Sequence, residues 1–201
     1  MSIVGCPAPS RAELRRDHIK EVARRLFVEH GFHSTGIALI AKESGVAVQQ
    51  LYRDFPSKED IIAAIVEANC SKFADLDRLN KALESRNQDG IIDWLNSATC
   101  RKDEEGDRLF LEIAAEAARN PRVSAIFHDV RQMMSDNISR AFAGLMDHET
   151  ADKEHRLLAE AFMIVSMGSV CTRTLHGSDV SQASNTLIAC LISAAVADRT
   201  V

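Results

Sequence analysis

Residues 34–59 read STGIALIAKESGVAVQQLYRDFPSKE and carry the most specific pattern in the chain. Its apolar residues form two short groups at helical spacing, with Ser44-Gly45-Val46 as a break between them. Two short helices joined by a glycine turn cross one another, and the exposed second helix can enter a DNA major groove about 12 Å wide. We therefore predict a helix-turn-helix whose second helix runs from about Ala47 to Tyr52 or Arg53.

The candidate DNA contacts follow from the side chains that this pattern leaves outside the apolar set. Glutamine pairs best with adenine N6 and N7, and hydroxyl and amine groups donate to phosphates, which position a protein without reading sequence. For Gln49 and Gln50, base contact and simple exposure to solvent are equally open. The predicted DNA-binding residues are Thr35, Ala47, Val48, Gln49, Gln50, Tyr52 and Lys58.

Helical signals continue on both sides of the motif. Upstream, apolar residues from Ile19 to Phe27 recur at helical spacing, and Gly31 follows as a helix end. Downstream, Ser57 with acids after it predicts the start of a long helix that could reach residues 87–90. Helical patterns then repeat to about residue 198, without the alternation typical of strands.

The fold class expected from these patterns is all-α. We predict a flexible arm over residues 1–12 and a three-helix DNA-binding domain over residues 13–57. A bundle of about six helices, for ligand binding and dimerisation, then covers residues 58–201.

Composition and charge narrow the class of protein. Of the 201 residues, 46% are hydrophobic and 26% charged, which is ordinary for a globular protein. Nine Lys and Arg against six acids give residues 1–58 a charge of +3, whereas the remainder carries −8. This charge distribution is consistent with an N-terminal domain that faces the phosphates of DNA and an acidic body that does not.

Targeting signals and cysteine spacing give an expectation about location. No stretch approaches the roughly 20 apolar residues that span a bilayer, and residues 1–10 do not resemble a secretory signal. The five cysteines form no CxxC pair, which favours reduced thiols. We expect a cytoplasmic protein with no membrane partner.

The same residues carry a specific resemblance over about 45 positions. The run from Ile19 to Thr35, the segment IAKESGV of residues 40–46, and the segment LYRDFPSKE of residues 51–59 resemble the TetR family of regulators. The resemblance implies that Thr35, Tyr52 and Lys58 face phosphates and that the third helix supplies base contacts. It also implies a homodimer that binds a near-palindromic double-stranded operator. A small-molecule effector is expected to bind in the C-terminal body.

Three positions depart from the family pattern. Family members usually have serine at Ala47, where it caps the third helix, and many have a small residue at Gln49. Asp54 takes a place often held by histidine or tyrosine near the DNA backbone. An acid there would repel phosphate, so we leave Asp54 out of the contacts. Ala47 and Asp54 keep open an alternative function, a helical ligand-binding or interaction protein with a degenerate DNA-binding domain.

The body offers adaptable apolar side chains for an effector pocket, although plain core packing is the favoured explanation for any one of them. His128 and Arg173 could be polar anchors if they face inward. The last two helices, at about 154–175 and 178–198, mix large and small apolar residues and are expected to pair in the dimer. The pocket candidates are Trp94, Cys100, Phe110, Met133, Met134, Phe162, Met163 and Met167.

Catalytic and metal sites have little support in the sequence. His148, Glu149 and His155 lie close together, but such groups are mostly solvated turns, and no HExxH-like spacing is present. A glycine-rich phosphate loop and a GxSxG motif are also missing. We therefore expect neither an enzyme nor a cofactor or metal. The resemblance instead implies a ligand-responsive regulator, a repressor that leaves a palindromic operator when a small, largely apolar molecule binds the C-terminal domain.

Overall fold

The computed structural model describes residues 9–99, 104–177 and 181–198, and the side chains of 69–74, 98–99 and 181 fall outside that description. Within these ranges the chain forms helices and connections only, so the predicted all-α class is confirmed. The first three helices are α1 (Arg11–His30), α2 (Ile37–Ser44) and α3 (Val48–Asp54). The body consists of α4 (Lys58–Ala74), α5 (Leu76–Glu84), α6 (Gln88–Thr99), α7 (Glu104–Ala117), α8 (Pro121–Leu145), α9 (Lys153–His176) and α10 (Ser181–Asp198).

The helix predicted to follow Ser57 is divided into two helices, α4 and α5. The sequence pattern predicted a single helix from Ser57 towards residue 87, but the described chain breaks between α4 and α5 at Asp75, where φ is 23°. The carboxylate of Asp75 accepts a hydrogen bond from the backbone N–H of Arg78 and so begins α5. The described body therefore has seven helices where about six were expected.

Side-chain caps explain where several helices begin. The Ser10 hydroxyl accepts from the Glu13 N–H, and the Glu13 carboxylate accepts from the Ser10 N–H. This capping box starts α1 at Arg11, inside the stretch predicted as a flexible arm. Ser57 caps α4 as predicted, and Asn120 caps α8 with Pro121 in the first turn.

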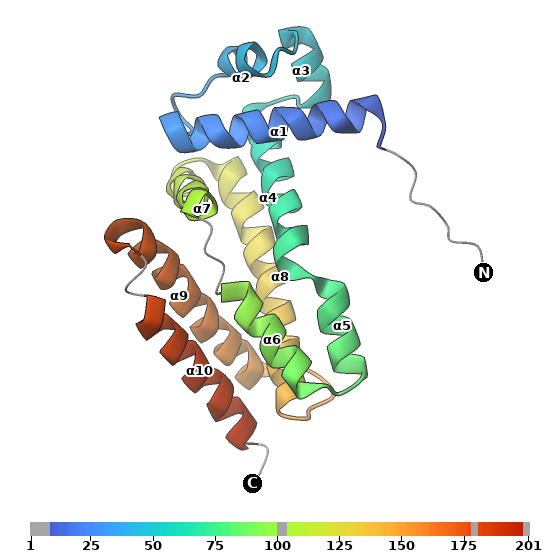
Figure 1. Ribbon diagram of the computed structural model, residues 1–201, viewed down its shortest axis with the longest axis vertical. Coiled ribbons are helices and arrows are strands. Elements are labelled where there is room, and N and C mark those ends of the chain that lie inside the picture. Colours follow the sequence, from blue (N-terminus) through green and yellow to red (C-terminus); the bar gives the residue numbers. More distant parts are fainter. Residues whose placement is uncertain (1–8, 100–103, 178–180, 199–201) are drawn as a thin grey trace, which may run out of the picture.

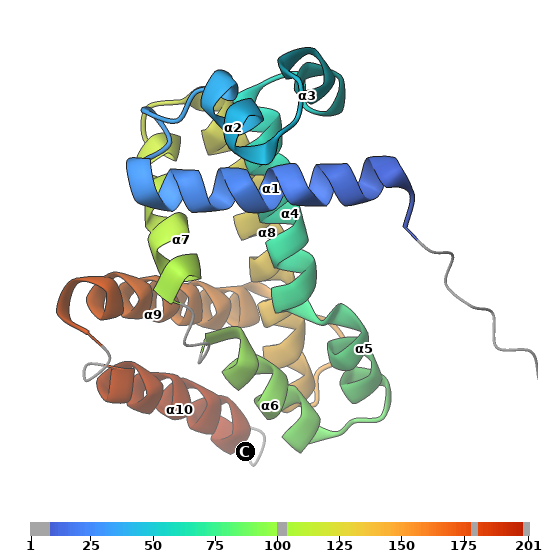
Figure 2. The same cartoon turned by 45° about the horizontal axis from the view of Figure 1, so that its top comes forward.

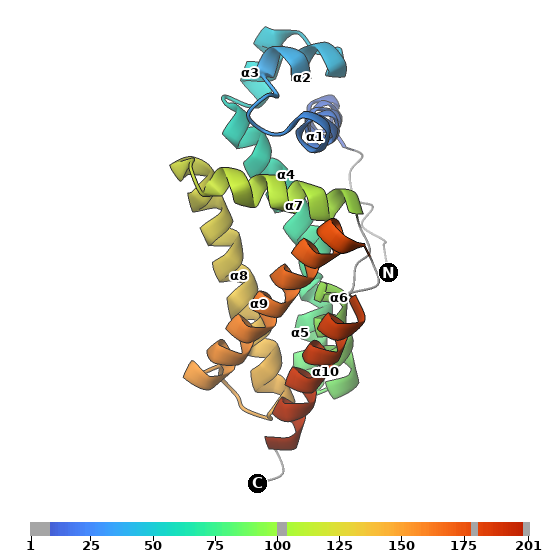
Figure 3. The ribbon, with the colours of Figure 1, turned by 90° about the vertical axis from the view of Figure 1, so that its left-hand side faces the viewer.

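The helices are arranged along one long axis. In Figure 1, α2 and α3 lie above α1 at one end, and α10 lies towards the opposite end. Figure 2 shows α9 and α10 side by side, and Figure 3 shows α7 lying across the molecule between α1 and α9. Helices α2 and α3 and the last two helices are therefore well separated, with α4, α7 and α8 between them.

Two clusters of buried apolar side chains hold this arrangement together. The first joins α1–α3 to α4, α7 and α8 of the body, where it includes Ile61, Leu109 and Val123. The second joins α5, α6, α8, α9 and α10 around Trp94 and Phe142. Because the first cluster includes α7 and α8, the N-terminal helices pack directly onto the body.

The helix α9 differs from the sequence expectation about apolar stretches. By length and composition alone it is apolar enough to cross a membrane, and only 22% of the relevant window is buried inside the molecule. The helix is this apolar because apolar residues lie on its outer side as well as on its inner side. Leu157, Ile164 and Leu175 are 71%, 66% and 72% exposed. An outer apolar side of this extent calls for a partner.

Candidate nucleic-acid interface

The outer side of α3 is the most prominent exposed feature of the N-terminal helices. Val48 and Tyr52, which are large and apolar or aromatic, are 43% and 50% exposed, and Gln49 and Arg53 are exposed with them. Gln50 is half-buried on one flank. Five of the predicted contacts, Ala47 to Gln50 and Tyr52, thus lie together on or beside one accessible surface.

The inner side of α3 is fixed by apolar packing. Leu51 is fully buried and Phe55 is 1% exposed, and both belong to the first cluster together with Phe27. Ala47 precedes the helix as its N-cap and makes no side-chain cap hydrogen bond. The helix therefore depends on its apolar side and its neighbours, because the usual capping hydroxyl is missing.

Asp54 is bound from α1. Its carboxylate accepts two hydrogen bonds from Arg15, Nε to Oδ2 at 2.6 Å and Nη2 to Oδ1 at 3.0 Å. Arg16 donates to the Asp54 backbone carbonyl, and its guanidinium lies 4.2 Å from the centre of the Phe55 ring. The Arg15 guanidinium holds the pKa of the Asp54 carboxyl below its ordinary value, so this acid is ionised and paired at neutral pH.

This network changes the interpretation of Asp54. The sequence suggested a carboxylate that would repel phosphate, whereas its side chain is only 9% exposed and faces a guanidinium. Sequence reasoning missed Arg15 and Arg16 as partners because Arg15 and Asp54 stand 39 positions apart. The only local signal was two adjacent arginines in the first turns of α1.

Thr35 is not available to phosphate, and the expectation for it was wrong. It is completely buried, and its hydroxyl lies 3.1 Å from the Leu26 carbonyl oxygen and 2.9 Å from that of Gly31. The side chain therefore ties the connection before α2 to the end of α1. Gly36, which precedes α2 as its N-cap, supplies no side-chain hydrogen bond.

Lys58 is turned towards the protein. Its Nζ donates to the Phe32 carbonyl oxygen at 2.6 Å and lies 4.0 Å from the centre of the Phe32 ring. Burial lowers the pKa of this amine, although the carboxylates of Glu59 and Glu116 oppose the shift. Lys58 joins the start of α4 to the end of α1, and two of its three N–H donors remain for a further contact.

The pocket candidates among the described residues divide into two groups. Trp94 and Phe162 are 0% and 1% exposed and are part of the second cluster, so they are core residues in this conformation. Cys100 lies outside the described residues. The half-buried candidates come from three adjoining helices and are Phe110 on α7, Met133 and Met134 on α8, and Met163 and Met167 on α9.

Neither of the two surface cavities that we describe is lined by those candidates. One, of about 560 Å³, lies along the first turns of α9 between Asp152 and Glu160. The other, of about 500 Å³, lies at the end of α8 and includes Arg86, Arg140 and His148. The two possible polar anchors also face elsewhere: His128 is exposed, and Arg173 is paired with Asp107.

The histidines between α8 and α9 form a pair that the sequence did not predict. His155 is fully buried, and its Nε2 lies 3.0 Å from Nδ1 of the exposed His148. The Nδ1 atom of His155 lies 3.0 Å from the backbone N of Asp152. A solvated turn was expected for these residues, but His155 is part of the N-terminal cap of α9.

Comparison with known proteins agrees with this geometry. The family described as "Bacterial regulatory proteins, tetR family" matches residues 19–65. The transcriptional regulator UidR of Escherichia coli K12 is 29% identical over 134 residues, which cover 65% of this chain and 66% of that protein. Salmonella enterica GusR has a TM-score of 0.67 at 23% identity and covers 96% of this chain and 98% of its own. The SmeT–triclosan complex has a TM-score of 0.67 at 18% identity and covers 88% and 91%.

The matched residues and the fold cover different parts of the molecule. Residues 19–65 contain all of α2 and α3 and the start of α4, and the likeness in fold to GusR extends over almost the whole chain. The family match thus lies in the N-terminal helices, and the likeness in fold extends to the helical body. This chain belongs to the TetR family of helix-turn-helix transcriptional regulators.

Proposed function

We propose that this regulator is a homodimeric repressor that leaves a near-palindromic operator when a small, largely apolar molecule binds its body. The observation that carries the proposal is the exposed outer side of α3, with Val48, Gln49 and Tyr52, on a helix fixed from behind by Leu51 and Phe55. In this proposal the two α3 helices of a dimer enter successive major grooves about 34–36 Å apart. The protein acts in the cytoplasm by binding and not by catalysis.

The second copy is argued from the outer sides of α9 and α10. On α9, Leu157, Ile164, Gly168 and Leu175 repeat with spacings of four and seven residues and are exposed. On α10, the apolar or small residues at 183, 187, 190 and 194 repeat at four and three and are also exposed. Such spacing places each set on one helix side, and glycine and alanine allow helices to approach closely. Burying both sets in a four-helix contact between two copies would remove them from water.

A charge placed in this contact tests the dimer. Ile164→Glu puts a carboxylate on a side chain that is 66% exposed in one copy, so the single chain should fold normally. Sedimentation velocity should then give a mass near 22.1 kDa, whereas the wild type should give twice that value. Leu14→Glu, at a 54% exposed leucine on α1, is the matched control and should stay dimeric. A wild-type monomer would refute the dimer.

Effector action requires a link from the body to α3, and α4 supplies it. Asn120, the N-cap of α8, donates to Glu59 of α4 at 3.2 Å and to Glu116 of α7 at 3.3 Å. Arg122 of α8 donates to Asp60 at 3.3 Å. A ligand that displaced α7 or α8 would pull on the start of α4, which directly follows α3. A coupling of about 1–3 kcal/mol is enough to change operator occupancy.

An apolar effector fits the half-buried methionines and Phe110 on α7, α8 and α9, because such side chains form adaptable walls. The solved SmeT complex contains triclosan, an example of a small molecule bound by a protein of this fold. For this chain the corresponding experiment is thermal denaturation with a library of small apolar compounds. A true effector should raise the midpoint and release DNA at the same concentrations.

The DNA-binding function itself is tested by selecting genomic fragments on the purified protein and sequencing them. We expect enrichment of a near-palindromic sequence. Tyr52→Ala should weaken binding to that fragment in fluorescence anisotropy. No enriched fragment would refute the proposal and favour the ligand-binding protein with a degenerate DNA-binding domain.

A further inference from the structure

Gln50 is bound by the same carboxylate that Arg15 holds. Its Nε2 donates to Asp54 Oδ2 at 3.3 Å, one helical turn along α3. Asp54 receives the two hydrogen bonds from Arg15 at 2.6 and 3.0 Å. Arg15, Asp54 and Gln50 therefore form a chain of donors and an acceptor that leads from α1 to the flank of the exposed side of α3.

The carboxylate decides which way round the Gln50 amide stands. An ionised carboxylate only accepts hydrogen bonds, so the amide group beside it must be the NH₂ and not the oxygen. The pairing with Arg15 keeps this carboxylate ionised and in place, since a bidentate contact fixes orientation as well as distance. After this bond, Gln50 still has one N–H and its carbonyl oxygen. Those are the two groups that pair with N7 and N6 of adenine.

We propose that Asp54 is a positioning residue for DNA sequence recognition, and that, held by Arg15, it orients the Gln50 amide to select an A·T pair in each half-site. This inference rests on the proposed function, because it requires that α3 enter the major groove. It gives a function to a residue whose charge otherwise opposes phosphate binding. The Asp54 side chain does not contact phosphate; it fixes the orientation of the Gln50 amide, which contacts the base.

The proposal separates base preference from general DNA affinity. A good bidentate contact discriminates against a wrong base by about 5- to 150-fold. Removing Asp54 should therefore lower the preference at one position of each half-site. Binding to unrelated DNA should stay level or become tighter, because a negative charge near phosphate is lost. A residue that merely supported the fold would weaken binding to all sequences together.

The experiment measures anisotropy of the selected operator and of a set in which each half-site position is changed to the other three bases. Gln50→Ala should abolish the preference at one position, and Asp54→Ala should reduce it at the same position. The double variant should resemble Gln50→Ala alone, since Asp54 acts through Gln50. Gln132→Ala removes an equivalent bond on α8, from the Gln132 amide to Asp136 at 3.2 Å; it is the matched control and should leave the base preference unchanged.

Two further measurements keep the test decisive. Arg15→Met leaves Asp54 and Gln50 intact but removes the anchor, so it should give a smaller loss at the same position. Circular dichroism and thermal denaturation identify any variant that does not fold. If a folded Asp54→Ala keeps the full base preference that Gln50→Ala loses, the positioning role is overturned. If the wild type prefers no sequence at all, the DNA-recognition function is overturned, and this inference with it.

Discussion

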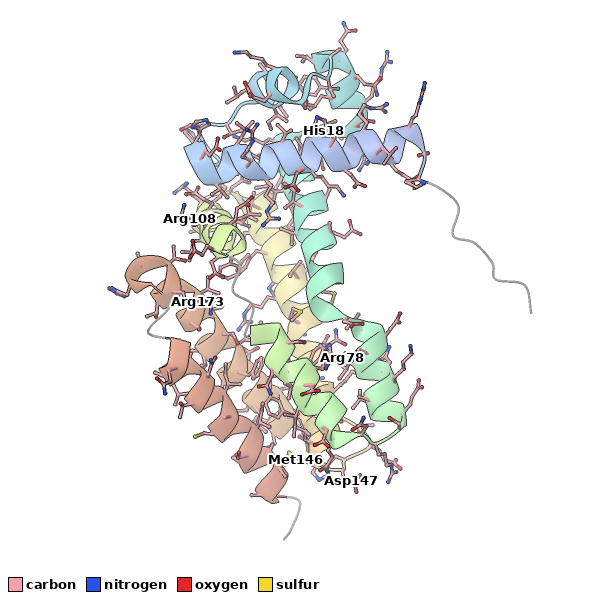
Figure 4. The ribbon with its side chains drawn as sticks, viewed as in Figure 1. His18, Arg78, Arg108, Met146, Asp147 and Arg173 are labelled. Carbon is pink, nitrogen blue, oxygen red and sulfur yellow. The ribbon has the colours of Figure 1, made fainter. Side chains whose placement is uncertain are left out.

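The ion pair between α7 and α9 gives the most quantitative prediction. Arg173 donates to Asp107 through Nε and Nη2, both at 2.9 Å, and through Nη1 to the Ser169 hydroxyl at 3.0 Å. The two charged side chains are 12% and 14% exposed. Figure 4 marks Arg173 on the part of α9 that lies beside α7. Asp107→Ala would leave the guanidinium buried without its counter-charge.

The expected cost is large because an unpaired charge stays behind. Removing one partner of a buried pair costs about 3–5 kcal/mol. With a urea dependence of about 3 kcal/mol per molar, the unfolding midpoint should fall by about 1–1.7 M. The double variant Asp107→Leu with Arg173→Met replaces both charges by apolar groups and should recover most of the loss.

Urea unfolding followed by circular dichroism measures both variants at one fixed protein concentration, because the stability of a dimer depends on concentration. A loss below about 1 kcal/mol for Asp107→Ala would mean that the pair is effectively solvated. A double variant as unstable as Asp107→Ala would refute the reasoning in another way, since the cost could not then come from the unpaired charge.

Three other predictions concern separate parts of the molecule. Arg15 lowers the pKa of Asp54, so the stabilisation from this pair is complete above the ordinary pKa near 3.9 and disappears as the pH falls through the lowered pKa. The advantage of the wild type over Asp54→Asn in unfolding free energy should therefore shrink below about pH 4, and an advantage that grew there would contradict this direction of the pKa shift. Gly144→Val should cost about 1–3 kcal/mol in thermal denaturation, because a Cβ at Gly144 would overlap Leu83 Cδ2 and lie 3.1 Å from Ile91 Cδ1, and an unchanged midpoint would show that both side chains move aside freely. Tyr52→Phe should weaken binding to operator and to unrelated DNA by a similar factor, about tenfold, because a phosphate contact carries no sequence information; a loss confined to the operator would make Tyr52 a base contact.

Much of the fold could be predicted because local signals agree with the packing. The caps at Ser57 and Asn120 and the turn at Gly45, where φ is 66°, are written in short stretches of sequence. The break at Asp75 could not be predicted in this way, because no glycine or proline marks it. A residue other than glycine with positive φ is uncommon, so the sequence gives little reason to expect one at Asp75.

The exposed outer side of α3 was predicted from helix periodicity, whereas contacts with residues distant in the sequence were missed. Val48 and Tyr52 follow from which side of α3 is apolar. Thr35 and Asp54 depend instead on atoms of α1, such as the Gly31 carbonyl and the Arg15 guanidinium. A polar residue in a motif can serve DNA or the protein, and only the folded chain distinguishes the two.

In the proposed complex, two copies of α3, held in one dimer, bind two half-sites on one side of the DNA. The most direct measurement is the affinity for the selected operator with no insertion, with five base pairs and with ten base pairs inserted between the half-sites. Five base pairs turn one half-site by about half a helical turn to the opposite side of the duplex. We predict that this insertion reduces affinity to that of a single half-site. Equal affinity for the original and the five-base-pair operator would contradict the account.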